Sequence, residues 1–245
     1  MSSTSPLATT DEMAGQPPAS ELTRIRSAYA KRNGRSIYSL FEPAQLLAIQ
    51  ERERQLLRLL SARGVTSLES SKILEVGCGT GLWLREFVRW GARPENITGV
   101  DLLAERIAEA RRLCPPQLKL ECGSATQLSS GNAEFDLVVQ STVFTSILDP
   151  KVKIRIASEM LRVLRPEGSI VWYDFRFDNP RNPDVRGIKA KEMRSLFPGC
   201  CFEFHKVTLA PPVARPVARL SRTLHAILSS IAPLRTHYLA LIARI

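Results

Sequence analysis

The chain has 245 residues and a formal net charge of +10, and its apolar content of 44% is typical of a globular domain. No apolar run reaches the roughly 18 residues that a membrane-spanning helix needs. The five cysteines are an odd number without metal-ligand spacing, and the three histidines are scattered late in the chain. We therefore expect free thiols, no metal site, no disulfide and a reducing, cytoplasmic location.

The N-terminal region differs in composition from the rest of the chain. Residues 1–20 are rich in Ser, Thr, Ala and Pro and lack the basic and apolar regions of a signal peptide, which predicts a disordered leader. Residues 21–64 predict an N-terminal helical cap, in which a short basic helix precedes a longer helix with an apolar stripe. Tyr38 lies between these helices, where it would either line the mouth of a pocket or pack in the entry loop.

The most informative stretch is 73–81, which reads ILEVGCGTG. Its first four residues form an apolar, β-prone run, as in a buried parallel strand. Gly77, Gly79 and Gly81 then allow the backbone to turn tightly and to pass close to a ligand. Apolar residues with helical spacing follow directly. The stretch therefore predicts the first strand-turn-helix unit of a nucleotide-binding α/β domain.

The spacing of this turn differs from the dinucleotide fingerprint G-x-G-x-x-G, which would need glycine at the position of Leu82. Glu75, two residues before Gly77, would instead suit a ligand that carries a free amino group and a sulfonium cation. The pattern E-x-G-x-G-x-G at the end of a strand resembles motif I of the class I S-adenosylmethionine (SAM)-dependent methyltransferases. A glycine-rich turn without a ligand is the alternative.

Residues 96–101 predict a second strand that ends in an acid. Asp101 lies 20 residues beyond Gly81, about where α/β nucleotide domains place a carboxylate that binds ribose. A carboxylate can accept hydrogen bonds from two vicinal hydroxyl groups at once. An acid that caps the helix starting near Leu103 would have the same sequence pattern, so both roles remain open.

Two further strands lead into loops that bear on the ligand. The strand 118–122 precedes Ser124 and Ala125, where the resembled family usually carries an acid for the adenine amino group. The strand 134–140 leads into Ser141–Phe144, which resembles the region that lies beside the reactive methyl group in that family. This loop is neither N-P-P-Y nor D-P-P-Y and lacks the Pro-Cys of cytosine-C5 enzymes. Its sequence therefore disfavours a nucleic-acid substrate.

The resemblance implies that SAM is the cofactor and S-adenosylhomocysteine the product. Glu75 and the backbone of Gln140 would hold the methionine end, Asp101 the ribose, and Leu102, Ser124 and Ala125 the adenine. The implied cofactor-binding residues are Glu75, Gly77, Cys78, Gly79, Gly81, Asp101, Leu102, Ser124, Ala125 and Gln140.

The rest of the chain completes a predicted α/β fold. A helix that begins at Asp149-Pro150 leads to a fifth strand, 169–174, and two strands, 201–209 and 237–245, come late in the chain. One amphipathic helix over 213–232 is expected to pack on the core; a membrane-surface or lid element is the alternative. By resemblance, residues 65–245 form a Rossmann-like, seven-stranded, mostly parallel sheet with helices on both faces and a C-terminal antiparallel hairpin.

The expected function is methyl transfer to a small-molecule acceptor by O- or N-methylation, with an anionic, glycan or natural-product intermediate among the candidates. Asp174 is the best-placed general base, although an acid that caps a loop would look the same. Tyr38, Phe144 and Arg176 are the candidate acceptor residues. The last 70 residues carry twelve Lys or Arg and four Asp or Glu, which favours either an anionic acceptor or a solvated basic face. An RNA methyltransferase and a non-catalytic SAM-binding protein are the alternatives.

Overall fold

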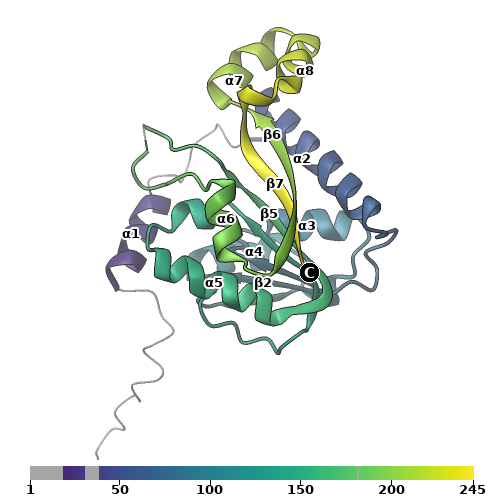
Figure 1. Cartoon of the computed structure of the whole chain (residues 1–245), viewed down its shortest axis with the longest axis vertical. Coiled ribbons are helices and arrows are strands. Elements are labelled where there is room, and N and C mark those ends of the chain that lie inside the picture. Colours follow the sequence, from purple (N-terminus) through teal and green to yellow (C-terminus); the bar gives the residue numbers. More distant parts are fainter. Residues whose placement is uncertain (1–18, 31–38, 181) are drawn as a thin grey trace, which may run out of the picture.

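The computed structural model describes residues 19–30, 39–180 and 182–245. In this part of the chain, a 7-stranded sheet has the order β3-β2-β1-β4-β5-β7-β6 (Figure 1). Neighbouring strands among the first five pair in parallel, and β7 pairs antiparallel with both β5 and β6. The strands are β1 Ile73–Val76, β2 Ile97–Asp101, β3 Lys119–Cys122, β4 Phe135–Ser141, β5 Leu164–Phe175, β6 Cys200–Leu209 and β7 Arg235–Arg244. The predicted Rossmann-like sheet with its C-terminal antiparallel hairpin is confirmed.

Helices cover both faces of the sheet (Figure 1). Their bounds are α1 Ala19–Ala30, α2 Pro43–Ala62, α3 Leu82–Arg89, α4 Ala104–Leu113, α5 Pro150–Val163, α6 Ala190–Leu196, α7 Pro211–Leu220 and α8 Arg222–Ser230. Short 3-10 turns lie at Pro94–Asn96, Phe144–Ser146 and Ala232–Leu234. In the described ranges, no helix is both long and apolar enough to cross a membrane.

The core consists of one apolar cluster on each face of the sheet. On one face, α2, α3 and α4 pack side chains such as Leu56 and Phe87 against the strands. On the other face, α5 and α6 pack around Met160 and Trp172. All four residues of β1 are buried, because this strand lies between β2 and β4 in the middle of both clusters. Since α2 shares the first cluster, part of the predicted N-terminal cap packs directly on the sheet.

The C-terminal region corrects one sequence prediction. The amphipathic segment 213–232 is not one helix, because α7 ends at Leu220 and α8 begins at Arg222. Ser221 between them has extended backbone angles, and its side chain accepts a hydrogen bond from the Leu224 amide as the N-cap of α8. The two helices form a hairpin between β6 and β7 and stand off the end of the sheet (Figure 1).

Phe144, predicted to contact the acceptor, is a core residue in the structure. Its side chain is 0% exposed, and its ring centroid lies 4.4 Å from that of Trp172 and 6.4 Å from that of Phe197. The 3-10 turn Phe144–Ser146 directs the ring down between β5 and α6 instead of into a pocket. The prediction failed because an apolar residue just after a strand can belong to either the pocket or the core.

Replacing Phe144 tests this placement. Phe144→Ala should lower the free energy of unfolding by about 3–5 kcal/mol, because a buried aromatic side chain is lost and a cavity remains. Phe41→Ala is the control, since Phe41 is 99% exposed and its loss should change stability by less than about 0.5 kcal/mol. Urea denaturation measures both values. Equal stability of the two variants would contradict a core position for Phe144.

Candidate cofactor and active site

The glycine turn after β1 is held tightly against β2 and α3. The amides of Gly77 and Cys78 both donate to the carbonyl oxygen of Val100, at 2.7 and 3.1 Å. Gly77 has a φ of +70°, and a Cβ there would lie 2.4 Å from a methyl carbon of Val143. Gly81 has a φ of +76°, and a Cβ there would lie 2.4 Å from the Cys114 sulfur. The turn therefore needs glycine for its backbone angles and for lack of space.

Asp101 connects this turn to the next helix. Its Oδ2 accepts a hydrogen bond from the Gly79 amide at 2.8 Å, and its Oδ1 accepts one from the Leu103 amide at 2.9 Å. The helix-capping role that the sequence left open is therefore present, because Leu103 immediately precedes α4. Each carboxylate oxygen accepts up to two hydrogen bonds, so Asp101 retains the capacity to bind a ribose hydroxyl.

A pocket of 80 Å³ lies at the carboxyl ends of β1, β2 and β3. Five of the predicted cofactor residues line this pocket: Gly77, Asp101, Leu102, Ser124 and Ala125. This edge of a parallel sheet is where α/β folds bind their ligands. Ser124 also shares a hydrogen bond with Thr126, at 2.7 Å between the hydroxyl oxygens, so its side chain shapes the loop that borders the pocket.

Helix α1 closes the pocket from outside, which the sequence analysis did not find. Ile25 and Tyr29 line the pocket, and the Tyr29 ring lies 4.7 Å from the guanidinium carbon of Arg106. Arg24 pairs with Glu21 at 2.7 Å and donates to the carbonyl oxygen of Ser146 at 2.5 Å. These contacts hold α1 against the loop after β4. The sequence signal was a short basic helix, which does not say where that helix docks.

Glu75 is a buried carboxylate beneath the glycine turn. Its side chain is 2% exposed, and in the described part of the chain its Oε2 has no hydrogen-bond partner. Burial raises the pKa of Glu75 well above its usual range; the nearby Arg52 opposes the shift and Asp101 adds to it. A buried carboxylate oxygen without a hydrogen-bond partner is energetically unfavourable. A cationic or N–H ligand that bound to Glu75 would supply the missing partner.

Arg52 of α2 is a second residue that the sequence analysis missed. Its guanidinium carbon lies 4.3 Å from the Trp83 ring and 5.0 Å from the Tyr173 ring. Burial lowers the pKa of Arg52, and the charge of Glu75 partly offsets this effect. The site thus places a cation and an anion near each other beneath one turn. Arg52 lies far from the glycine motif in sequence, so only the fold reveals the pair.

Comparisons with known proteins agree with this geometry. Residues 73–168 match the profile of a protein family described as "Methyltransferase domain". The chain is 28% identical over 125 residues to a ubiquinone biosynthesis O-methyltransferase of Parvibaculum lavamentivorans, a match that covers 50% of this chain and 48% of that protein. It is 33% identical over 118 residues to a phthiotriol/phenolphthiotriol dimycocerosates methyltransferase of Mycobacterium leprae, with coverage of 46% and 41%. The matches thus span less than half of each relative's length.

Solved structures share the fold at lower identity. A Burkholderia thailandensis 1,6-didemethyltoxoflavin-N1-methyltransferase with bound S-adenosylhomocysteine has a TM-score of 0.56 at 20% identity, covering 99% of this chain and 92% of that chain. A putative sarcosine dimethylglycine methyltransferase from Galdieria sulphuraria has a TM-score of 0.61 at 16% identity, with coverage of 80% and 86%. Residues 73–168 thus match a methyltransferase domain, and the chain shares the fold of solved methyltransferases.

The other predicted cofactor residues of this methyltransferase domain lie around the pocket without lining it. Gln140 of β4 is fully buried; its Oε1 accepts from the Val143 amide at 3.2 Å, and its Nε2 has no partner in the described ranges. Burial raises the pKa of the Cys78 thiol, so this thiol stays protonated and packs beneath the turn. The roles of Gln140, Cys78, Gly79 and Gly81 in cofactor binding stay predictions.

Asp174 caps a loop, which is the role that the sequence left open as the alternative to a general base. Its carboxylate is 1% exposed and accepts from the Thr145 hydroxyl at 2.6 Å, the Thr145 amide at 3.2 Å and the Phe175 amide at 3.0 Å. These bonds fasten the loop after β4 to the end of β5. Asp174 does not line the pocket, so this geometry does not support contact with an acceptor. Burial raises the pKa of Asp174 to about 7, and its hydrogen bonds oppose the shift.

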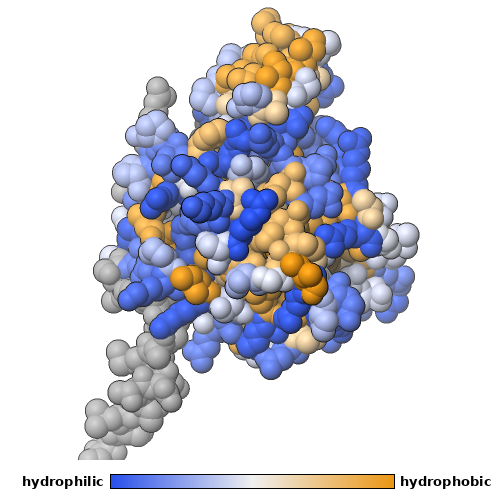
Figure 2. All heavy atoms as spheres, in the orientation of Figure 1, coloured by the Kyte–Doolittle hydropathy of each residue, from blue (hydrophilic) through white to orange (hydrophobic). Residues whose placement is uncertain are grey.

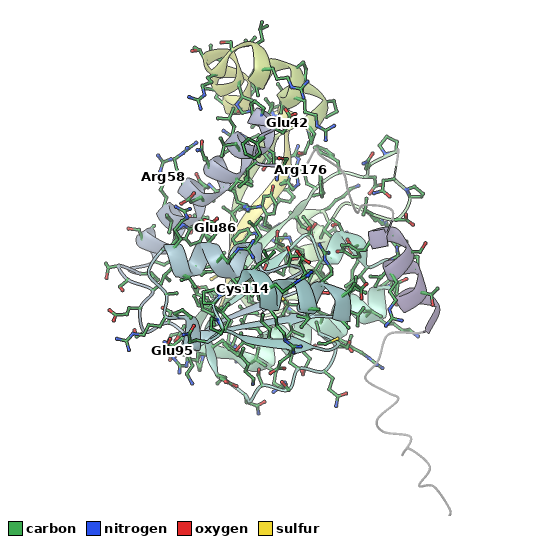
Figure 3. All side chains as sticks on the ribbon, turned by 180° about the vertical axis from the view of Figure 1, so that it is seen from behind. Glu42, Arg58, Glu86, Glu95, Cys114 and Arg176 are labelled. Carbon is green, nitrogen blue, oxygen red and sulfur yellow. The ribbon has the colours of Figure 1, made fainter. Side chains whose placement is uncertain are left out.

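The structure describes only some of the candidate acceptor residues. The Arg176 guanidinium carbon lies 4.2 Å from the Phe177 ring and 5.6 Å from the Tyr238 ring, and its Nε is buried without a partner in the described part of the chain. Arg176 lies near the carboxyl end of β5 (Figure 3). Tyr38 lies outside the described residues. No group of three or more Cys, His, Asp or Glu in the described ranges could hold a metal ion.

The raised pKa of Asp174 predicts a pH-dependent stability. In the unfolded chain this group ionises near its usual pKa of 3.8, but in the folded chain only near pH 7. Between these values the unfolded state binds fewer protons, so the free energy of unfolding should fall as pH rises, by on the order of 4 kcal/mol for about three pKa units. Asp174→Asn should lack this fall.

Urea denaturation of both proteins between pH 4 and pH 8 measures the difference, since other titrating groups contribute equally to the two. Asp136→Asn is a control, because Asp136 is a partly exposed acid that pairs with Arg165. A constant difference between wild type and Asp174→Asn across this range would contradict a carboxyl group that stays protonated until near neutrality.

Proposed function

We propose that the chain transfers the methyl group of SAM to a small-molecule acceptor. The observation that carries this proposal is the buried Glu75 carboxylate beneath the glycine turn, whose Oε2 has no hydrogen-bond partner in the described part of the chain. Asp101 at the adjoining pocket supports it, since it would accept from the ribose hydroxyls. The names of the relatives, which include an O-methyltransferase and an N-methyltransferase acting on small molecules, agree with this class of acceptor.

The methionine end of SAM is a zwitterion, and the site offers one charge of each sign. Glu75 would accept from the ammonium group, while Arg52 would attract the carboxylate. Leu102, Ser124 and Ala125 would border the adenine at the far end of the pocket. Tyr29 and Ile25 of α1 would then cover the bound nucleoside and exclude water. SAM supplies the electrophilic methyl group when bound, because its carbon is attached to a sulfonium.

The chain's own contribution is therefore mostly orientation. Holding two reactants in line can contribute ~7–11 kcal/mol to catalysis, which makes a strong base unnecessary for many acceptors. This agrees with the position of Asp174, whose hydrogen bonds fasten a loop. The choice between O- and N-methylation depends on the acceptor and not on a residue that the site displays.

Glu75→Gln separates the binding role of this residue from its effect on stability. Loss of a charge-assisted hydrogen bond should weaken SAM binding about 10- to 100-fold. The same change should raise the melting temperature of the free protein, because it removes an unpaired ionisable group from the interior. Calorimetry and thermal melting measure the two effects, and Glu69→Gln, at an exposed position, is the control.

The pH dependence of binding gives a second measure of the same role. Only the ionised Glu75 attracts an ammonium group, so SAM affinity should rise as pH rises through the elevated pKa of Glu75. In Glu75→Gln the affinity should be flat over that range. A variant with wild-type affinity and an unchanged pH profile would remove Glu75 from the site.

Methyl transfer itself is tested by incubating the protein with methyl-tritiated SAM and a lysate of the native host. A small labelled product that survives RNase treatment supports the proposal. Label that RNase releases would identify an RNA substrate, and SAM binding without any transfer would identify a non-catalytic binder. Either of these results would contradict a small-molecule methyltransferase.

An acidic acceptor is the favoured class, because residues 176–245 carry a net charge of +8. Arg176 follows β5 at the edge of the sheet that holds the site, and its planar guanidinium suits a carboxylate or phosphate. Once the labelled product is identified, Arg176→Ala should raise the KM for the acceptor severalfold and leave SAM affinity unchanged. Arg58→Ala, at an exposed position of α2, is the control. An unchanged KM at low salt would show that Arg176 does not contact the acceptor.

A further inference from the structure

The α7–α8 hairpin rises from the edge of the sheet where the candidate site lies. Strand β7 is antiparallel to both β5 and β6, so β6 runs in the same direction as the parallel strands. The hairpin follows the carboxyl end of β6, and Figure 1 shows it projecting beyond the sheet and the other helices. A structure at this position is exposed to the surroundings on several sides.

The outer face of this hairpin is apolar. Leu220 is 80% exposed, Leu224 38%, Ile227 56% and Ile231 41%. Leu224 and Ile227 lie three residues apart on α8, while Leu220 is the last residue of α7 and Ile231 follows the end of α8. The space-filling view shows the resulting apolar surface at the tip of the molecule (Figure 2). We call these four residues the apolar stripe.

The entry to α2 extends this apolar surface. Leu40 is 55% exposed and Phe41 99%, and both line a groove of 360 Å³ whose other wall includes Leu220 and Arg222. The inner side of the hairpin packs into a small separate cluster with Ala44 and Leu209. The expectation that this segment packs on the core therefore holds for its inner side alone. The outer side leaves large aliphatic side chains in water, which is unfavourable unless something covers them.

The charge around the apolar stripe is mostly positive. From Phe204 to Ile245 the sequence contains six Lys or Arg and no Asp or Glu. Arg215, Arg219 and Arg222 are exposed on the hairpin. Glu42, at the start of α2, pairs with Arg219 at 2.5 Å, and Figure 3 shows it at the junction of α2 and the hairpin. The surface thus combines aliphatic side chains with a cationic rim.

We propose that this tip docks on the surface of an anionic lipid bilayer. The apolar stripe would enter the interface between headgroups and acyl chains, and the arginines would meet the lipid phosphates. The convex shape, the aliphatic composition and the cationic rim all match that environment. Docking would bring the site edge of the sheet toward the membrane, where an acceptor that dissolves in lipid would be found. This proposal goes beyond the proposed function and does not require it to be correct.

Vesicle flotation of the full chain tests the proposal without SAM. Binding should be strong to vesicles that contain phosphatidylglycerol, weak to vesicles of phosphatidylcholine alone, and reduced by salt. Ile227→Glu should lower the vesicle partition coefficient by about tenfold or more, because it places a charge in the interface. The matched control is Ile154→Glu on α5, since Ile154 is 55% exposed and Ile227 56%; that variant should bind within about twofold of wild type.

Two arginine variants test the contribution of the cationic rim. Arg222→Ala should lower the partition coefficient about fivefold, as expected for one cation near an anionic surface, while Arg58→Ala on α2 should have little effect. Thermal melting and circular dichroism verify that all four variants fold. The proposal is overturned by absence of binding to anionic vesicles, or by equal losses in Ile227→Glu and Ile154→Glu. It is also overturned if Ile227→Glu only converts a dimer into monomers at unchanged vesicle binding, because the stripe would then be a subunit interface.

Discussion

The close approach of three chain segments at the glycine turn is the constraint on which this fold depends. Asp101 accepts hydrogen bonds from the Gly79 amide on one side and the Leu103 amide on the other. One carboxylate therefore fixes the turn after β1, the end of β2 and the beginning of α4. A Cβ would also not fit at Gly77, where Val143 lies close, or at Gly81, where Cys114 lies close. The carboxyl edge of the sheet is thereby shaped before any ligand arrives.

The hydrogen bonds of two buried carboxylates at this edge distinguish a residue that stabilises the fold from one that can bind a ligand. Asp174 has three donors within hydrogen-bond distance, which stabilise the loop that they connect. Glu75 is equally inaccessible, yet one of its oxygens has no partner in the described ranges. Burial raises the pKa of both groups, so the pKa alone does not distinguish them. The two groups differ in their free hydrogen-bonding capacity: the Glu75 oxygen that lacks a partner in the fold can gain one from a ligand.

The sequence predicted the parts of the molecule that local patterns determine. The apolar run before the glycines, the glycine spacing and the acid at the end of β2 are all short-range signals. The alternation of strands and helices indicated an α/β fold, and the seven-stranded sheet with its hairpin was expected from the family resemblance. The sequence did not reveal the roles of Arg52 and Tyr29, because these depend on where α2 and α1 dock on distant segments. The prediction that Phe144 contacts the acceptor was wrong, because its neighbours Trp172 and Phe197 come from elements that are remote in sequence.

The hairpin between β6 and β7 shows why periodicity alone could not assign that segment. Apolar residues on two sides of α7 and α8 produce a helical pattern whether a face is buried or exposed. Only the structure shows that the inner face packs on Ala44 and Leu209, while Leu220 and Ile227 face outward. Because β6 and β7 are fixed by a long antiparallel register and by the core, residues inserted between them can change without disturbing the glycine turn.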